Sequence, residues 1–106
     1  LKLVTGDNKK SIRFMKELLE EYIQDNKKVA IITTDENLSC FKDCELISLG
    51  KRNNLQEVAK NLFESLRKCD DLKVDYILCQ GFEEDGVGLA IMNRLNKAAG
   101  YDIIKV

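Results

Sequence analysis

The chain has 106 residues and a mass of 12.1 kDa, a size that one hydrophobic core can organise. Apolar residues make up 44% of the chain and charged residues 33%, a balance that excludes a disordered or fibrous protein. The formal net charge of -1 excludes a global positive field. We therefore expect no direct nucleic-acid binding and no attraction to anionic membranes.

The most informative absence is that of histidine, of which the chain has none. This removes the commonest general base, the commonest metal ligand and every nucleophile that a histidine activates. Catalysis that depends on a histidine is therefore excluded.

The four cysteines lie in a charged chain without an export signal, so we expect reduced thiols and a cytoplasmic location. The longest apolar runs have four residues, as at residues 29–32, whereas a membrane-spanning helix needs about 20. No membrane association is expected. Because the first residue is Leu1 rather than Met, we expect the chain to be part of a longer protein.

Short apolar runs alternate along the chain with segments of helical periodicity. Strands are predicted at residues 1–5, 29–33, 46–49, 75–79 and 103–106. Helices are predicted at residues 8–25, 55–69 and 87–99. The polar stretch 34–44 has room for one helical turn. Asp7 or Asn8 can cap the first helix, and Asn53 or Asn54 the second.

Apolar periodicity also predicts which helical residues reach the core. For the second helix these are Leu55, Val58, Ala59, Leu62, Phe63, Leu66 and Cys69. For the last helix they are Val87, Ile91, Leu95, Ala98 and Ala99, with Gly100 as the residue that ends the helix in a left-handed conformation.

Strands that alternate with helices at this spacing predict parallel strands joined by crossover helices. We expect one three-layer α/β/α, Rossmann-like domain over residues 1–106, with a mainly parallel sheet of about five strands. Right-handed crossovers place helices on both faces and gather the loops that follow the strand carboxyl ends along one rim. Any binding site is expected on that rim.

The best candidate on the rim is an anion site. Lys51 and Arg52 precede a helix N-terminus, where two cations and free N–H groups favour a phosphate or a carboxylate. A solvated polar loop is the alternative, and the commoner outcome for surface charges. The candidate ligand-binding residues of the rim are Thr33, Thr34, Lys51, Arg52, Asn53 and Gln80.

The sequence GVGLAI at residues 86–91 invites comparison with the dinucleotide-binding fingerprint. The third glycine is missing, and the motif begins several residues after the predicted strand. We expect Gly86 and Gly88 instead to permit a sharp turn and a close approach of the helix to the sheet.

Two further clusters could hold a metal ion. Glu83, Glu84 and Asp85 could bind Mg²⁺ or supply a base, but consecutive loop residues point in different directions, which favours a solvated acidic loop. Cys40 and Cys44 would need two more ligands for zinc, and the other two cysteines fall on predicted core positions. No metal site is expected.

The last helix carries a polar surface around Asn93 and Arg94. It is a candidate docking face, and the ordinary solvated side of an amphipathic helix is the alternative. The candidate interdomain docking residues are Glu83, Glu84, Asn93 and Arg94.

Several segments together carry a family pattern. They are LGKRNNL at residues 49–55, AKNLFESLR at 59–67, DYIL at 75–78, Gly81-Phe82, GVGLAIMNRL at 86–95 and KAAG at 97–100. The pattern resembles the accessory C-terminal domain of two-domain threonylcarbamoyl-AMP synthases, strongly from Leu49 onward and in outline before it.

The resemblance implies a parent enzyme that condenses L-threonine, bicarbonate and ATP into threonylcarbamoyl-AMP and pyrophosphate, for threonylcarbamoyladenosine modification of tRNA. In that family an N-terminal YrdC-like domain and a linker carry the catalysis, and this chain contains neither. The resemblance implies no cofactor in this domain, and ATP, with or without Mg²⁺, in the parent. The implied partners are the YrdC-like domain and linker of the same protein and, indirectly, the tRNA modification machinery.

We therefore expect a non-catalytic module that docks on the catalytic domain and gates its site. One alternative is a module that senses a small anionic ligand or a nucleotide through the rim loops. Another is an independent Rossmann-like enzyme.

Overall fold

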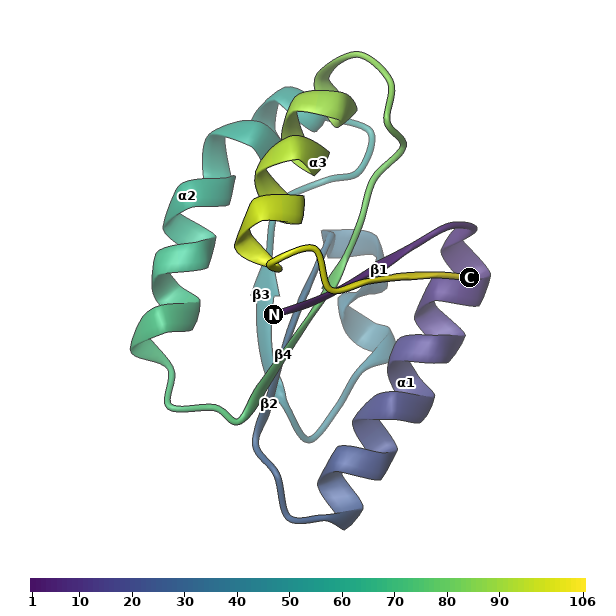
Figure 1. Cartoon of the computed structure of the whole chain (residues 1–106), viewed down its shortest axis with the longest axis vertical. Coiled ribbons are helices and arrows are strands. Elements are labelled where there is room, and N and C mark those ends of the chain that lie inside the picture. Colours follow the sequence, from purple (N-terminus) through teal and green to yellow (C-terminus); the bar gives the residue numbers. More distant parts are fainter.

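A five-stranded parallel sheet with helices on both faces forms the centre of the computed structural model, which describes residues 1–106 (Figure 1). The strands are β1 (Lys2–Thr5), β2 (Val29–Thr33), β3 (Glu45–Ser48), β4 (Tyr76–Gln80) and β5 (Ile103–Lys105). The helices are α1 (Asn8–Gln24), the short 3-10 helix η1 (Asp35–Cys40), α2 (Leu55–Asp71) and α3 (Val87–Ala98). The three-layer α/β architecture predicted from the sequence is confirmed.

The strand order in the sheet is β3-β2-β4-β1-β5. The strand β4 thus lies between β1 and β2, which are consecutive along the chain. Helix α1 covers one face of the sheet, whereas α2 and α3 lie side by side on the other (Figure 1). The adjacent strands β1 and β4 are therefore followed by helices on opposite faces of the sheet.

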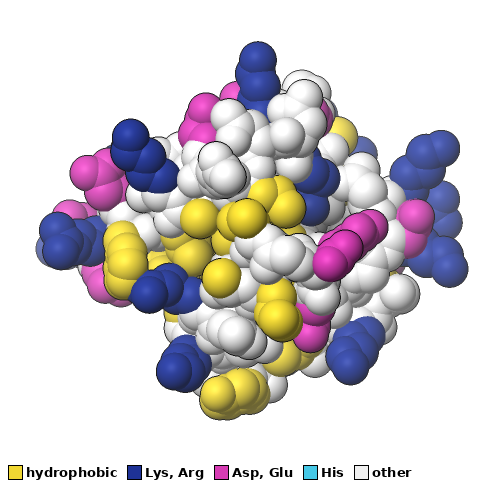
Figure 2. All heavy atoms as spheres, turned by 90° about the horizontal axis from the view of Figure 1, so that it is seen from above, with side chains coloured by type: hydrophobic (Ala, Val, Ile, Leu, Met, Phe, Trp, Pro, Cys, Tyr) yellow, Lys and Arg dark blue, Asp and Glu magenta, His cyan; other side chains and the backbone are white.

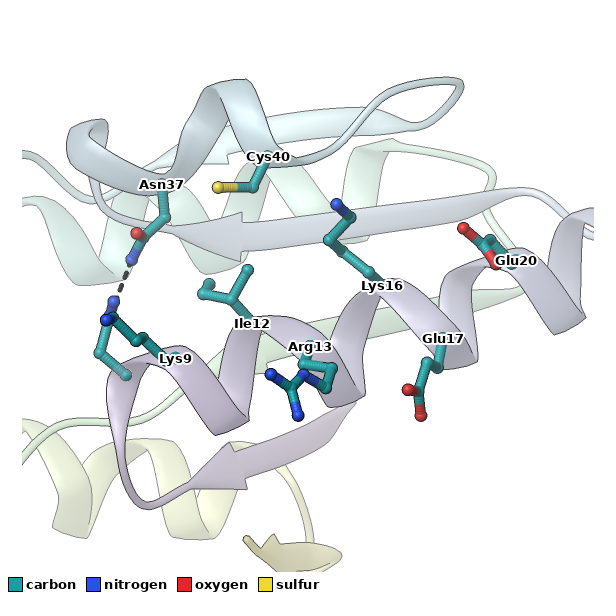
Figure 3. A pocket seen from close by; sticks show the side chains of 9 residues that line it. Lys9, Ile12, Arg13, Lys16, Glu17, Glu20, Asn37 and Cys40 are labelled. Carbon is teal, nitrogen blue, oxygen red and sulfur yellow. Dashed lines mark hydrogen bonds between the residues drawn. The ribbon is translucent and has the colours of Figure 1, made fainter.

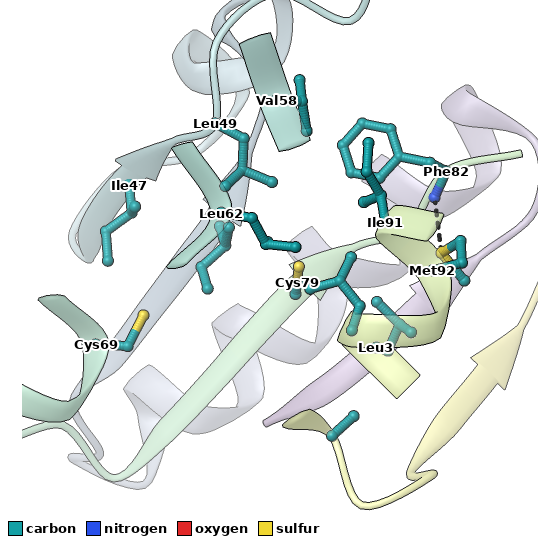
Figure 4. Close-up of a cluster of buried hydrophobic side chains, with 13 residues drawn as sticks. Leu3, Ile47, Leu49, Val58, Leu62, Cys69, Cys79, Phe82, Ile91 and Met92 are labelled. Carbon is teal, nitrogen blue, oxygen red and sulfur yellow. Dashed lines mark hydrogen bonds between the residues drawn. The ribbon is translucent and has the colours of Figure 1, made fainter. Parts of the chain in front are cut away.

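The sheet separates two hydrophobic clusters, because successive strand residues point to opposite faces. Ile31 belongs to the cluster of eight buried residues beneath α1, and its neighbour Ile32 belongs to the cluster of 13 on the other side. In the larger cluster, Leu62 of α2 packs with residues of the sheet that include Leu3 and Cys79 (Figure 4). Continuous apolar runs in the central strands are what burial on both faces requires.

The helix N-termini are capped by side chains that the sequence predicted. The Asp7 carboxylate accepts a hydrogen bond from the backbone N–H of Lys10 at 3.1 Å. The Asn54 side chain accepts one from the backbone N–H of Glu57 at 3.2 Å. Gly100 follows α3 with a φ of +58°, as expected for a residue that ends a helix.

The predicted core positions of α2 and α3 are wrong at their margins. Phe63 is 57% exposed and Val87 is 37% exposed, and Ala59 and Ala98 also lie on the surface. Met92, which the prediction left out, is buried. The physical reason is that α2 and α3 pack beside each other on one face of the sheet, so a residue at the edge of the apolar stripe contacts neither the sheet nor a further helix and stays exposed to solvent.

Of the two expectations for Gly86 and Gly88, the sharp turn is confirmed and the close approach of the helix to the sheet is not. Gly86 has a φ of +56°, which confirms the sharp turn. A β-carbon at Gly88 would overlap the carbonyl oxygen of Glu83. The close approach that needs Gly88 is therefore to the loop before α3, and the expectation of an approach to the sheet is wrong.

Candidate functional site

The loops that follow β1 and β4 line a crevice on the rim, which is the candidate binding site. Because β1 leads to a helix on one face and β4 to a helix on the other, a crevice opens between these neighbouring strands at their carboxyl ends. In open parallel sheets, ligands bind at such a point of reversal. Seen from above, this end of the molecule carries hydrophobic side chains near its centre with acidic and basic side chains around them (Figure 2).

A partly buried network of amide and hydroxyl side chains forms the floor of this crevice. Gln80, at the end of β4, accepts hydrogen bonds from the Thr33 hydroxyl at 2.7 Å and from Asn37 Nδ2 at 3.0 Å. Gln80 Nε2 donates to Asn8 Oδ1 at 2.8 Å, and Asn37 Nδ2 donates to the same oxygen at 3.0 Å. These bonds tie together the carboxyl ends of β2 and β4, the start of α1 and η1. A satisfied polar network of this kind rigidifies the loops that it joins.

Arg52 lines the crevice, and contacts with three other residues hold it in place. Its backbone N–H donates to both carboxylate oxygens of Glu36, at 2.9 and 3.2 Å. Its Nη1 donates to the carbonyl oxygen of Gly81 at 3.2 Å, and its guanidinium carbon lies 4.4 Å from the centre of the Phe82 ring. The stack on Phe82 is a cation–π contact.

Two of the guanidinium nitrogens have no partner. Nε and Nη2 of Arg52 are shielded from solvent and have no hydrogen-bond acceptor in the chain. Burial lowers the pKa of Arg52, and the nearby carboxylates of Glu36 and Glu83 oppose this effect. The pKa of Glu36 is lowered: burial alone would raise it, but hydrogen bonds from the backbone N–H groups of Glu36 and Arg52 outweigh that effect.

The crevice has a volume of about 510 Å³. It is lined by Gly6, Asp7, Asn8, Arg52, Gln80, Gly81, Phe82, Glu83 and Glu84. Three carboxylates thus face one cation, although the Asp7 carboxylate is engaged at the N-terminus of α1. The remaining two, on Glu83 and Glu84, are exposed.

A second hollow of about 480 Å³ runs between α1 and η1 (Figure 3). Lys9, Arg13 and Lys16 line it from α1, and Asn37 and Cys40 from η1. It is open and also contains acidic side chains of α1, so nothing in it converges on one ligand group.

The structure separates the rim residues that the sequence grouped together. Of the six candidates, only Arg52 and Gln80 line the crevice, and Thr33 supports it from beneath through Gln80. Lys51 and Asn53 are exposed in the turn before α2, away from the crevice lining. Thr34 is fully buried, and its hydroxyl oxygen has no hydrogen-bond partner.

The four candidate docking residues fall on two different surfaces. Glu83 and Glu84 stand at the crevice, whereas Asn93 and Arg94 lie on α3 with Ala90 and Lys97 around a shallow hollow. The guanidinium carbon of Arg94 lies 3.6 Å from the centre of the exposed Phe63 ring on α2. Sequence reasoning missed this stack because it placed Phe63 in the core.

Sequence reasoning also missed Asn8 and Asn37 as members of the network. Asn8 was considered only as a helix cap, and Asn37 lies in a stretch without periodicity. Their partners are 29 to 72 residues away along the chain, so no local signal identifies them.

The buried cysteines Cys69 and Cys79 are kept in the protonated thiol form, which is a poor nucleophile. Burial raises the pKa of the Cys79 thiol to about 12 and that of the Cys69 thiol to about 11. No group of three or more Cys, Asp or Glu side chains is arranged to hold a metal ion.

None of the helices is both long enough and apolar enough to cross a membrane.

Comparison with known proteins decides the family. The model of the family described as threonylcarbamoyl-AMP synthase, C-terminal domain, matches residues 1–100. The chain belongs to this family of C-terminal domains. A threonylcarbamoyl-AMP synthase from Bacillus subtilis (strain 168) is 43% identical over 88 residues, which cover 83% of this chain and 25% of that protein.

Two solved structures extend the similarity to the fold. The Pyrococcus abyssi Sua5 protein complexed with L-threonine matches 99% of this chain at 41% identity with a TM-score of 0.84, and the match covers 30% of that protein. A C-terminal Sua5 domain from Pyrococcus horikoshii matches 98% of this chain at 40% identity with a TM-score of 0.74, and the match covers 93% of that domain. The chain therefore spans less than a third of the full-length relatives, and the domain type folds as a separate chain.

Proposed function

We propose that this chain is the non-catalytic C-terminal domain of a threonylcarbamoyl-AMP synthase, and that it docks on the catalytic part of the same protein and gates the site for ATP and L-threonine there. The length of the relatives supports this choice of partner. The match covers 25% of the Bacillus subtilis protein and 30% of the Pyrococcus abyssi protein, so most of each relative lies outside it.

The observation that carries the proposal is the exposed stack of Phe63 and Arg94. Phe63 is 57% exposed although it is a large aromatic residue, and the guanidinium carbon of Arg94 lies 3.6 Å from the centre of its ring. Val87 and Ala90 precede Arg94 by seven and four residues, spacings that put all three on one side of α3. We call these four residues the α2–α3 surface.

The chemistry of the α2–α3 surface suits a protein partner. Aromatic and arginine side chains are enriched in protein interfaces, and they supply much of the binding energy there. An exposed cation–π contact is worth only about 0.5 to 1 kcal/mol, so the stability of the domain alone gives little reason for this pair. Arg94 and Lys97 favour an apolar partner surface that offers carboxylates or carbonyl oxygens.

Gating follows from the rigidity of this layer. The buried sides of α2 and α3 pack into the cluster of 13 residues, which joins the α2–α3 surface closely to the sheet. A rigid body docked beside an active site can hold a covering segment in its closed position, and closure of such segments excludes water and completes catalytic sites.

The experiment uses the complete protein that contains this domain, with Phe63→Asp and Arg94→Glu combined. We expect turnover at limiting ATP and L-threonine to fall at least about fivefold, the loss expected from one interface residue that contributes about 1 kcal/mol, and up to about 30-fold if both residues contribute that much. Leu46→Asp is the control, because Leu46 is 41% exposed and its neighbour Ile47 packs in the cluster beneath α2, which directs Leu46 to the opposite face.

Equal turnover by the double variant and the parent protein would contradict the docking proposal. The proposal of a non-catalytic domain fails separately if this chain alone converts ATP, bicarbonate and L-threonine into threonylcarbamoyl-AMP.

A further inference from the structure

We propose that the crevice between β1 and β4 binds a free α-amino acid, with the ligand's carboxylate on Arg52 and its ammonium group facing Glu83 and Glu84. This site is separate from the α2–α3 surface, and it does not depend on docking. It would make the domain a sensor of amino acid.

The unpaired donors of Arg52 share one edge of its guanidinium group. Nη1 is used by the Gly81 carbonyl, so the nitrogens left without an acceptor are Nε and Nη2. These two lie on the same edge of the planar guanidinium group, and their N–H bonds are parallel. A carboxylate pairs with that edge through two hydrogen bonds, one to each oxygen.

No carboxylate of the chain pairs with that edge. The one ion pair of the chain joins Lys2 and Asp102, far from the crevice. Glu36 binds the backbone N–H of Arg52, and Glu83 is near enough to raise the pKa of Arg52 without forming an ion pair. Buried donors without acceptors destabilise the folded chain, and a carboxylate ligand would satisfy them.

The mixed charge of the crevice lining favours an amino acid over a simple anion. A phosphate or a nucleotide on Arg52 would meet the carboxylates of Glu83 and Glu84 as well. A zwitterion satisfies both signs, because its carboxylate pairs with Arg52 while its ammonium group faces the two glutamates. These glutamates are exposed, so the ammonium group would keep part of its hydration.

Hydrogen bonds hold the floor of the crevice in place. Gln80 and Asn8 line the crevice and are held by the hydrogen bonds of the partly buried network. A preformed floor lowers the ordering cost of binding. The Nε–Nη2 edge is shielded, so entry of a ligand requires the side chains over this edge to shift.

The test is a calorimetric titration of this chain with L-threonine, L-alanine and glycine. Because the proposed contacts involve only the groups common to all amino acids, all three should bind saturably at one site. N-acetyl-L-threonine lacks the ammonium group, and L-threonine amide lacks the carboxylate. Each should bind at least about tenfold more weakly, the ratio expected for loss of one charge-assisted contact worth about 1.4 kcal/mol.

Variants locate the site. Arg52→Lys keeps the charge but loses the two-pronged edge, and it should weaken binding about tenfold or more. Glu83→Gln combined with Glu84→Gln should also weaken it. Lys51→Gln is the matched control, because Lys51 is the neighbouring cation and does not line the crevice. The urea midpoint of each variant shows whether it has folded.

A second readout uses the unaltered chain. The Nε–H resonance of Arg52, assigned by its loss in Arg52→Lys, should shift on saturation with glycine, while the resonances of the other arginines stay in place. No saturable heat with any of the three amino acids would overturn the proposal. Tighter binding of inorganic phosphate or AMP than of glycine would overturn it as well, and so would equal affinity in Arg52→Lys.

Discussion

Leu62 and Phe63 are neighbours on α2 with opposite environments, and alanine substitution separates their roles. Leu62 is 2% exposed and belongs to the cluster of 13 buried residues, whereas Phe63 is 57% exposed. Leu62→Ala should lower the free energy of unfolding by about 2 to 5 kcal/mol, because it removes buried methyl groups and leaves a cavity. This is a large part of the roughly 5 to 15 kcal/mol that stabilises a domain.

Phe63→Ala should cost much less, since it removes little buried area and one exposed cation–π contact worth about 0.5 to 1 kcal/mol. Urea unfolding followed by far-ultraviolet circular dichroism measures both values on the chain alone. A larger loss of stability in Phe63→Ala than in Leu62→Ala would refute the assignment of Phe63 to an exposed docking surface. An unchanged midpoint in Leu62→Ala would refute the described packing of α2.

Three further outcomes follow from single contacts. Glu36→Gln should destabilise the chain at neutral pH. Because folding lowers the pKa of Glu36, the ionised carboxylate stabilises the folded chain above the unfolded pKa of about 4.5, and this stabilisation is lost as the pH falls below that value. The urea midpoints of variant and parent should therefore converge in acid. Gly6→Ala should cost more than about 1 kcal/mol in the same assay, because Gly6 has a φ of +125° and a β-carbon there would overlap the Val106 carbonyl oxygen; an unchanged midpoint would contradict this turn geometry. Cys79, with its pKa raised to about 12 by burial, should resist iodoacetamide at about pH 8 until urea unfolds the chain, and rapid labelling of the folded chain would contradict its burial. Because its pKa is higher in the folded chain than the unfolded value of about 9, the free energy of unfolding should decrease as pH rises from about 9 toward 12.

The sequence predicted the layers of this fold because the relevant signals are local. The run at residues 29–33 has no alternation of polar and apolar residues, and β2 is buried along its whole length. The strand order could not be predicted, since the insertion of β4 between β1 and β2 depends on pairing between distant segments. Phe63 was misplaced for a related reason: helical periodicity gives the direction of an apolar stripe, whereas the width of its buried part depends on the neighbouring helix.

The candidate site was predicted in part. The rule that parallel strands bring their carboxyl-end loops together predicts the rim on which the crevice lies, and two of the predicted rim residues, Arg52 and Gln80, line that crevice. The sequence could not show that Lys51 turns away while Arg52 stacks on Phe82. Nor could it show the amide network, whose bonds join residues as many as 72 positions apart.

The central claim, that this domain acts by docking on the catalytic part of its own protein, is tested most directly by hydrogen exchange. Backbone exchange in α2 and α3 is measured in this chain alone and in the complete protein, with the edge strand β3 as internal reference. Docking predicts slower exchange in the complete protein at the exposed turns around Phe63 and Arg94, and Phe63→Asp combined with Arg94→Glu should abolish that difference. Identical exchange of these turns in both proteins would contradict the claim.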